Sequence, residues 1–183
     1  MLDACNFSSG SEVMCKTIKF SLFCKLSKTG NRSLEVKGIM HIQLEEKLEW
    51  LLTEDAFNIY QQCMYTHTYE AYRNKVNDYI SDKNTKIYIC RVEDNIAGII
   101  VLTLTGDESA ELMGIAVHSG FRKQGIGSFL VRESANKMCI HWITAETDDD
   151  AVGFYEKMGF DISREVKYYG GKGVVRYHCS LDL

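Results

Sequence analysis

The stretch from Ile115 to Ser128 holds the residue types best suited to bind a negatively charged ligand. It reads as a strand, a short loop, and then Arg122-x-x-Gly125-x-Gly127 at the start of an amphipathic helix. The first-turn N–H groups of a helix lack partners within the helix, and the helix dipole adds partial positive charge there. Glycines allow a phosphate to approach these amides closely. The pattern therefore predicts a phosphate or pyrophosphate site.

Two other classes of phosphate-binding protein are disfavoured by the sequence. It contains no G-x-x-x-x-G-K-[ST] motif of nucleoside triphosphatases. It also contains no G-x-G-x-x-G after the first strand of a parallel unit, as a dinucleotide-binding fold requires. One alternative stays open, in which the glycines only form a turn in a structural domain that binds no ligand.

The elements that must position this loop follow from hydrophobic periodicity and turn residues. Thr53 is expected to cap a helix, and the polar turns after 92 and 106 separate antiparallel strands. The expected elements are helices within 45–82, one of them over 69–80, strands over 86–92, 96–106 and 109–118, a helix over 125–138, a strand over 139–146, a helix over 148–158, and strands over 160–169 and 174–181.

Composition predicts one globular domain with an unusual N-terminal segment. The chain has 183 residues, of which 45% are hydrophobic and 25% charged. Residues 1–39 are rich in Ser, Cys and Lys, and 17–26 alternates as a strand would. This segment is interpreted as an N-terminal extension or as an added strand and hairpin, while 40–183 is the functional domain.

Charge and cysteine content exclude several functions. The net charge of −4 argues against nucleic-acid binding, and the −7 carried by residues 41–183 suits a cationic substrate. The sequence contains no membrane-spanning stretch and no secretory signal, so we expect a cytoplasmic protein without a membrane partner. Seven cysteines without a C-x-x-C pair predict reduced thiols and no metal site.

Two motifs together resemble the GNAT superfamily of N-acetyltransferases, which move an acetyl group from acetyl-CoA to an amine. They are ELMGIAVHSGFRKQGIGSFLV (111–131) and AVGFYEKMGF (151–160). The resemblance covers 86–181 well, is loose over the preceding helices, and is absent for 1–39.

The resemblance implies an α+β fold of three layers, in which helices flank a central mixed, mainly antiparallel sheet. It also implies a splay between strands 109–118 and 139–146, acetyl-CoA as co-substrate, and no metal. The acceptor would be a small-molecule or protein amine, and a homodimer is common among relatives. A non-catalytic CoA-binding or interaction module of the same fold is the alternative.

In that family, loop amides hold the CoA pyrophosphate, and pantetheine pairs with the main chain of the preceding strand inside the splay. The Val117 N–H would then polarise the thioester carbonyl. The cofactor-binding residues implied by the resemblance are Ile115, Ala116, Val117, Arg122, Lys123, Gln124, Gly125, Ile126, Gly127, Ser128, Asp148, Phe154 and Tyr155.

Two residues are implied in catalysis. Tyr155 matches the tyrosine that protonates the leaving thiolate, and a phenol with a pKa of about 10 keeps its proton at neutral pH. It could instead only cap the core. Glu111 matches a general base that acts through a water, and simple alternation places it on one face with Met113, Ile115 and Val117. Its alternatives are a solvated carboxylate at the strand end or a water chain acting as base.

The second motif departs from the family at Asp148, where many members have Asn. This departure puts a specific hydrogen bond to CoA in doubt. The acidic run also suits a helix start, which Thr147 could cap. Phe154 and Phe160 are expected in the core as well.

Overall fold

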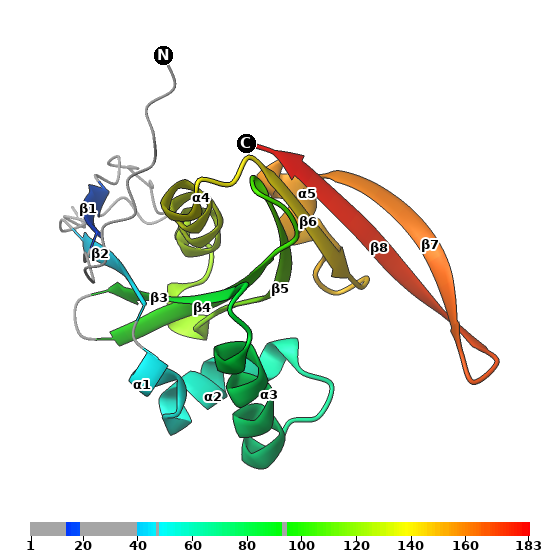
Figure 1. Ribbon diagram of the computed structural model, residues 1–183, viewed down its shortest axis with the longest axis horizontal. Coiled ribbons are helices and arrows are strands. Elements are labelled where there is room, and N and C mark those ends of the chain that lie inside the picture. The colour runs from blue at the N-terminus through cyan, green and yellow to red at the C-terminus, as the bar shows by residue number, and fades with distance from the viewer. Residues whose placement is uncertain (1–13, 19–39, 47, 93–94) are drawn as a thin grey trace, which may run out of the picture.

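The computed structural model describes residues 14–18, 40–46, 48–92 and 95–183, which form a sheet with helices on both faces (Figure 1). The strand order is β1-β2-β3-β4-β5-β6-β8-β7, and among the described strands only the β5–β6 pair is parallel. The strands are β1 (Met14–Ile18), β2 (Met40–Glu45), β3 (Thr85–Val92), β4 (Asn95–Leu104), β5 (Ser109–Val117), β6 (Trp142–Thr147), β7 (Asp161–Tyr169) and β8 (Lys172–Asp182).

The helices form a layer on each face of the sheet (Figure 1). Helices α1 to α3 cover one face, and α4 and α5 cover the other, which makes three layers. The helical segments are α1 (Leu48–Leu51), α2 (Glu54–Tyr60), the 3-10 turn η1 (Gln61–Cys63), α3 (Tyr69–Ser81), the 3-10 turn η2 (Ser119–Phe121), α4 (Ile126–Met138) and α5 (Val152–Met158).

Two hydrophobic cores hold these layers to the sheet. The larger core packs Leu130 of α4 and Met158 of α5 against the central strands. The smaller core packs Tyr60 of α2 and Tyr72 of α3 against Ile99 on the opposite face. The predicted three-layer fold with a mixed, mainly antiparallel sheet is thus confirmed.

Local signals in the sequence place most of the elements. The Thr53 hydroxyl accepts the N–H of Ala56 at 3.3 Å, so the predicted cap is present. In the last hairpin, Gly170 and Gly171 both have positive φ, which suits the two-residue turn between β7 and β8.

Three expectations need correction. Residues 40–45, for which no strand was expected, form β2, because Ile42 and Leu44 alternate into the core. The segment 45–82 forms three helices and a 3-10 turn, and its first helix begins at Leu48, because residues 40–45 belong to β2. Helix α5 begins at Val152, four residues later than expected.

The N-terminal segment adds one strand within the described residues. Strand β1 pairs antiparallel with β2. The expected strand over 17–26 overlaps β1 only at its start, and the rest of it lies outside the described residues.

The cysteines match the expectation of reduced thiols only in part. Cys63, Cys90 and Cys179 are free, whereas Cys139 is disulfide-bonded, which corrects the prediction. Among the described residues, no helix has the length and apolar character needed to cross a bilayer.

Candidate functional site

Strands β5 and β6 pair over only four residue pairs and then separate. The last pair joins Leu112 and Ala145, whereas β5 continues to Val117 and β6 to Thr147. No described strand pairs with β5 on this side beyond that point. The predicted splay between these two strands is confirmed.

A β-bulge at Met113 changes the direction of side chains along β5. Leu112 pairs with Leu102 of β4, while Gly114 pairs with Val101, so Met113 is the extra residue on β5. A bulge of this kind shifts the side-chain alternation by one residue.

The bulge separates Glu111 from the residues beyond it. Leu112 packs into the core beneath α4, so its neighbour Glu111 points to the opposite face. Beyond the bulge, Ile115 and Val117 pack against the same α4-side core as Leu112. The prediction that Glu111 and Met113 share a face with these two residues is therefore wrong, because simple alternation does not continue through a bulge.

The main chain of Ile115 and Val117 faces the space between the separating strands. The N–H of His118 donates to the carbonyl of Ala97 on β4 at 2.9 Å. Because main-chain groups alternate in direction along a strand, the N–H and C=O of Val117 and Ile115 point toward β6. Ala116 instead pairs toward β4, and its side chain is buried beneath α2.

Side chains from the loop after α2 and from the loop after β5 bind these open carbonyls. The thiol of Cys63 donates to the Ile115 carbonyl at 3.0 Å. The Arg122 Nε donates to the Val117 carbonyl at 3.2 Å, and its guanidinium also hydrogen-bonds the side-chain oxygen of Gln62. Sequence reasoning missed Gln62 and Cys63, because neither lies in a motif or at a characteristic spacing.

The loop between β5 and α4 presents backbone amides at a helix start. Its shape is held by His118 Nδ1, which accepts the Gly120 N–H at 3.2 Å, and by the Gln124 side chain, which donates to the Gly120 carbonyl at 2.9 Å. Lys123 and Gly125 have positive φ values of 59° and 83°. In the described part of the chain, the N–H groups of residues 123–128 have no backbone acceptor. Together with the α4 dipole, these amides form a suitable anion site.

The two glycines of the loop serve different purposes. Gly125 adopts the left-handed conformation, and a Cβ added there would meet no atom within 4 Å. A Cβ on Gly127 would lie 2.8 Å from a ring carbon of Phe154. Gly125 therefore leaves open space in front of the amides, whereas Gly127 is required for the close packing of α4 on α5.

Tyr155 lies on α5 with its ring in the core. It is 5% exposed and packs edge-on against Phe154 and Phe160, with ring centroids 5.2 and 5.1 Å apart. The Phe154 ring itself is half-buried between Tyr155 and Gly127. Both phenylalanines therefore occupy core positions, as expected.

Groups on several elements raise the pKa of the Tyr155 hydroxyl. Burial raises the pKa of the Tyr155 hydroxyl, and the nearby Cys179, Cys63 and Asp148 raise it further. Cys63 is the residue that donates to the Ile115 carbonyl, so the phenol and the open half of β5 share a neighbour. The raised pKa keeps this hydroxyl protonated and able to donate a proton.

Asp148 stabilises the turn before α5 and faces a cation. Its carboxylate accepts the N–H of Asp150 at 3.2 Å and lies 3.7 Å from the Arg176 guanidinium. Helix α5 has Ala151 at its N-cap position without a side-chain hydrogen bond, so the expected cap by Thr147 is not formed. The carboxylate of Asp148 therefore already has two partners within the protein, the Asp150 N–H and the Arg176 guanidinium.

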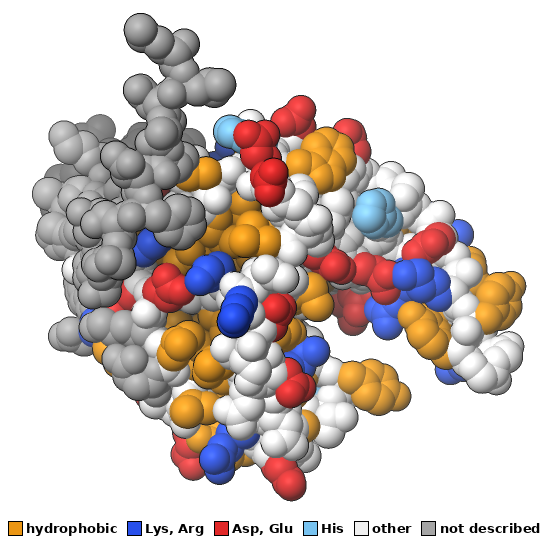
Figure 2. All heavy atoms as spheres, viewed as in Figure 1, with side chains coloured by type: hydrophobic (Ala, Val, Ile, Leu, Met, Phe, Trp, Pro, Cys, Tyr) orange, Lys and Arg blue, Asp and Glu red, His pale blue; other side chains and the backbone are white. Residues whose placement is uncertain are grey.

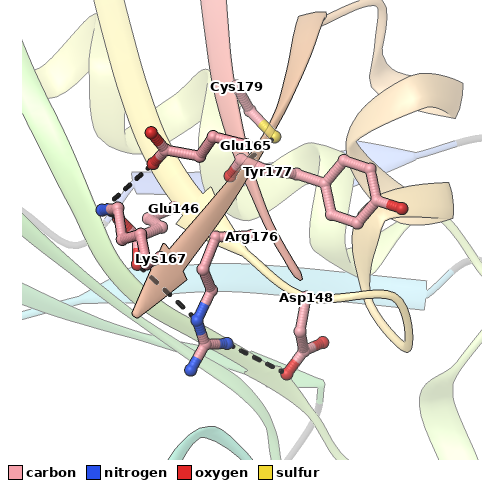
Figure 3. A network of polar contacts seen from close by, with 7 residues as sticks. All are labelled: Glu146, Asp148, Glu165, Lys167, Arg176, Tyr177 and Cys179. Carbon is pink, nitrogen blue, oxygen red and sulfur yellow. Dashed lines mark hydrogen bonds and ion pairs between the residues drawn. The ribbon is translucent and has the colours of Figure 1, made fainter. Parts of the chain in front are cut away.

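A charged network joins the diverging end of β6 to the last hairpin (Figure 3). Glu146, just beyond the last β5–β6 pair, binds Lys167 of β7 and lies 3.8 Å from the Arg176 Nε of β8. Lys167 also pairs with Glu165 at 3.2 Å. In Figure 3 the Tyr177 ring points away from this network, and its hydroxyl donates to Asp149 at 2.7 Å. These contacts hold the free end of β6 against β8 and away from β5.

The remaining candidates lie apart from this arrangement. Glu111 is exposed on the paired half of β5, and among the described residues no hydrogen bond or ion pair joins it to Tyr155 or the loop. His118 has a structural role in the loop. Within the described ranges, no group of His, Cys, Asp or Glu has the arrangement of a metal site.

The sequence matches the profile of the acetyltransferase (GNAT) family over residues 46–160, more than half of the chain. The chain therefore belongs to the GNAT acetyltransferase family, as its two motifs predict. No curated protein matches significantly.

Solved structures share the fold at low sequence identity. A GNAT-family acetyltransferase described as putative, from Desulfovibrio desulfuricans, aligns with a TM-score of 0.62 at 17% identity over 77% of this chain and 98% of its own. A GNAT-family acetyltransferase from Elizabethkingia anophelis, with acetyl-CoA bound, aligns with a TM-score of 0.56 at 19% identity over 78% and 98%. A variant of the spermidine N-acetyltransferase SpeG from Vibrio cholerae gives 0.60 at 15% identity over 77% and 93%.

Proposed function

We propose that the protein transfers an acetyl group from acetyl-CoA to a primary amine by direct attack in a ternary complex. The observation that carries this proposal is the arrangement around one strand end. The unpaired half of β5, with the main chain of Ile115 and Val117 open toward the splay, leads directly into a loop of free amides at the α4 N-terminus. Such a continuous surface suits an extended ligand with an anionic end.

In this proposal each part of the surface binds a different part of acetyl-CoA. The amides of residues 123–128 bind the diphosphate, and Gly125 leaves room for it. The pantetheine amides pair with Ile115 and Val117 like an added strand, and they displace the Cys63 thiol and the Arg122 side chain from the two carbonyls. The acetyl-CoA bound to one structural relative supports this assignment.

The chemistry requires stabilisation of an oxyanion and two proton transfers. The Val117 N–H donates to the thioester carbonyl, where negative charge develops as the amine nitrogen attacks. The new C–N bond forms as the C–S bond breaks, and Tyr155 donates its proton to the leaving sulfur. The proton of the amine passes to Glu111 through water, or to a water chain alone.

Direct attack is favoured over an acyl-enzyme route. The Cys63 thiol contacts the open half of β5, and burial around its sulfur raises its pKa to about 11, although the residue as a whole is exposed. A thiol that keeps its proton at neutral pH is a poor nucleophile. The acetyl group therefore passes straight to the amine.

The acceptor is proposed to be a cationic amine, either a small molecule or an amine of a protein. The charge of −7 over residues 41–183 supports this class. One structural relative is a spermidine N-acetyltransferase, so a polyamine belongs among the acceptors tested.

The test is release of CoA thiol from acetyl-CoA in the presence of polyamines, amino acids, aminoglycosides and peptide N-termini. The proposal predicts thiol release that depends on the acceptor, with the acetylated amine identified by mass spectrometry. Acetyl-CoA binding without turnover on any amine would favour a non-catalytic CoA-binding module. Absence of both binding and turnover would favour a structural domain.

A further inference from the structure

Two unfavourable choices of residue meet at one point beneath β5. Gly114 lies inside the strand, where glycine costs stability because it has no side chain to pack and loses much backbone freedom on folding. The Tyr60 side chain of α2 is 2% exposed, and its hydroxyl has no hydrogen-bond partner in the described part of the chain. Such a hydroxyl loses its hydration on folding without replacement. Unfavourable features of this kind are expected at functional sites.

The Tyr60 hydroxyl fills the space that a side chain at position 114 would take. A Cβ added to Gly114 would lie 2.3 Å from the hydroxyl oxygen and 3.0 Å from the ring carbon that bears it. No side chain fits at these distances, so the hydroxyl is in contact with the main chain of β5. Glycine is therefore required at this position because of Tyr60.

Helix α3 holds the Tyr60 ring against β5 from the other side. The ring centroid lies 6.1 Å from that of Tyr72, whose hydroxyl donates to the Leu51 carbonyl at 2.5 Å. Charged side chains cover the outer side of α3 (Figure 2), while Tyr72 and Tyr79 face the sheet. Burial raises the pKa of the Tyr60 hydroxyl and the nearby Tyr79 raises it further, but the two hydroxyls do not have the geometry of a hydrogen bond.

The contact lies at the bulge that redirects β5. Met113 is the extra residue of this bulge, and Gly114 follows it directly. Beyond the bulge, Ile115 and Val117 turn their main chain toward the splay. A small movement of Gly114 would therefore shift the peptide groups that are proposed to bind acetyl-CoA.

The chain that follows Tyr60 contacts the next residue of β5 as well. The thiol of Cys63, three positions after Tyr60, donates to the Ile115 carbonyl at 3.0 Å. Helix α2 and the η1 turn thus contact two successive residues of β5, one from the face of the sheet and one at its open edge. In the proposed function pantetheine displaces the thiol, so the contact of Tyr60 with Gly114 is the one that persists in the complex.

We propose that Tyr60 is a positioning residue for acetyl transfer, a role that rests on the proposed function. Its hydroxyl oxygen packs against Gly114 and fixes the bulge, so that Ile115 and Val117 hold the thioester in the geometry for attack. Tyr60 touches neither acetyl-CoA nor the amine and acts through the main chain of β5. The hydroxyl is retained without a partner because its volume is used, and not its hydrogen bond.

A double-mutant cycle on the full chain tests the contact without any measurement of activity. Gly114→Ala should lower the melting temperature by at least about 5 °C, because its methyl group overlaps the hydroxyl, and Tyr60→Phe should recover most of that loss. Tyr60→Phe alone should leave the melting temperature unchanged or raise it, since it removes a buried hydroxyl without a partner. Tyr79→Phe removes a second such hydroxyl and should give no recovery. A lower melting temperature of Tyr60→Phe, or equal recovery by both variants, would overturn the proposal.

Steady-state kinetics test the positioning role itself. Tyr60→Phe should lower kcat by about tenfold and change the KM for acetyl-CoA by less than about twofold, because the thioester shifts while the diphosphate contacts stay. Adding Gly114→Ala should restore part of kcat, since its methyl group refills the space of the lost oxygen, and Tyr79→Phe should keep the kcat of the wild type. An unchanged kcat of Tyr60→Phe, or a loss that Tyr79→Phe shares, would overturn this inference alone. A wild type without turnover on any amine would overturn the proposed function, and this role with it.

Discussion

Tyr155 is the side chain with the most specific proposed chemical role. Its ring is fixed by Phe154 and Phe160, while its hydroxyl lies near the thiol that contacts β5. The site combines a firmly packed aromatic ring with a hydroxyl that stays protonated at neutral pH. These properties suit a general acid for a thiolate leaving group.

Replacing Tyr155 by phenylalanine tests this role. We expect Tyr155→Phe to lower kcat by about 100-fold, in the range typical of a lost general acid, with little change in acetyl-CoA affinity. Because burial raises the pKa of the phenol, its acid form persists to higher pH, so its ionisation should cause no loss of kcat below about pH 10. Tyr88→Phe, at another buried phenol, is the control. Equal activity of wild type and Tyr155→Phe would remove the assignment.

The thiol of Cys63 offers a direct measurement of the environment next to the splay. Its pKa is raised by burial to about 11, so its thiolate, and with it the alkylation rate, should increase about tenfold per pH unit up to that value. Alkylation by iodoacetamide, followed by mass spectrometry of the Cys63 peptide, measures this rate. Glutathione under the same conditions should level off near the ordinary thiol value. A Cys63 rate that levels off at or below pH 9 would contradict the raised pKa of this thiol.

At the scale of elements, the contact between α4 and α5 explains one glycine of the motif. Gly127 allows the Phe154 ring to pack against the first turn of α4. The loop amides therefore keep their position partly because the second motif supports the first.

This contact predicts a difference between the two glycines. Gly127→Ala should destabilise the fold by about 1–3 kcal/mol, because its Cβ overlaps Phe154. Adding Phe154→Leu should recover part of that loss in a double-mutant cycle. Gly125→Ala meets open space and should lose only about 1–2 kcal/mol from its positive φ, with no recovery from Phe154→Leu. Thermal unfolding measures all five variants, including Phe154→Leu alone, and equal behaviour of the two glycines would refute the packing role.

The central elements could be predicted from the sequence, whereas the geometry of β5 could not. Apolar periodicity and polar turns predict each strand from β3 to β8, and the family resemblance of the two motifs predicts the splay between β5 and β6. The bulge stayed hidden because 115–117 is a continuous apolar run, in which a one-residue shift changes no residue type. Strand β2 is short and is followed closely by helical residues. The alternation of its apolar residues therefore does not distinguish a strand from the start of a helix.

Only part of the candidate site could be predicted from the sequence. The loop 122–128 and Tyr155 lie in recognisable motifs. Gln62 and Cys63 meet β5 only through tertiary structure, and the charged network around Glu146 joins three strands. Contacts of this kind depend on register and loop path, which single-sequence patterns do not carry.

At the scale of the whole molecule, the two motifs meet around one opening. The parallel β5–β6 pair ends early, and charged contacts to the last hairpin hold β6 on the far side. The same hairpin extends beyond the sheet as a two-stranded arm, in which residues 165–169 pair with 172–176 (Figure 1).

The central claim is that the loop amides and the open edge of β5 bind acetyl-CoA, and calorimetric titration of the full chain tests it most directly. We predict one site per chain, with the unfolding free energy raised by about 2.7 kcal/mol at a ligand concentration about 100 times Kd. Pantetheine, which lacks the diphosphate, should bind at least about tenfold more weakly. Absence of heat and of thermal stabilisation at millimolar acetyl-CoA, or equal affinity for pantetheine, would contradict the claim.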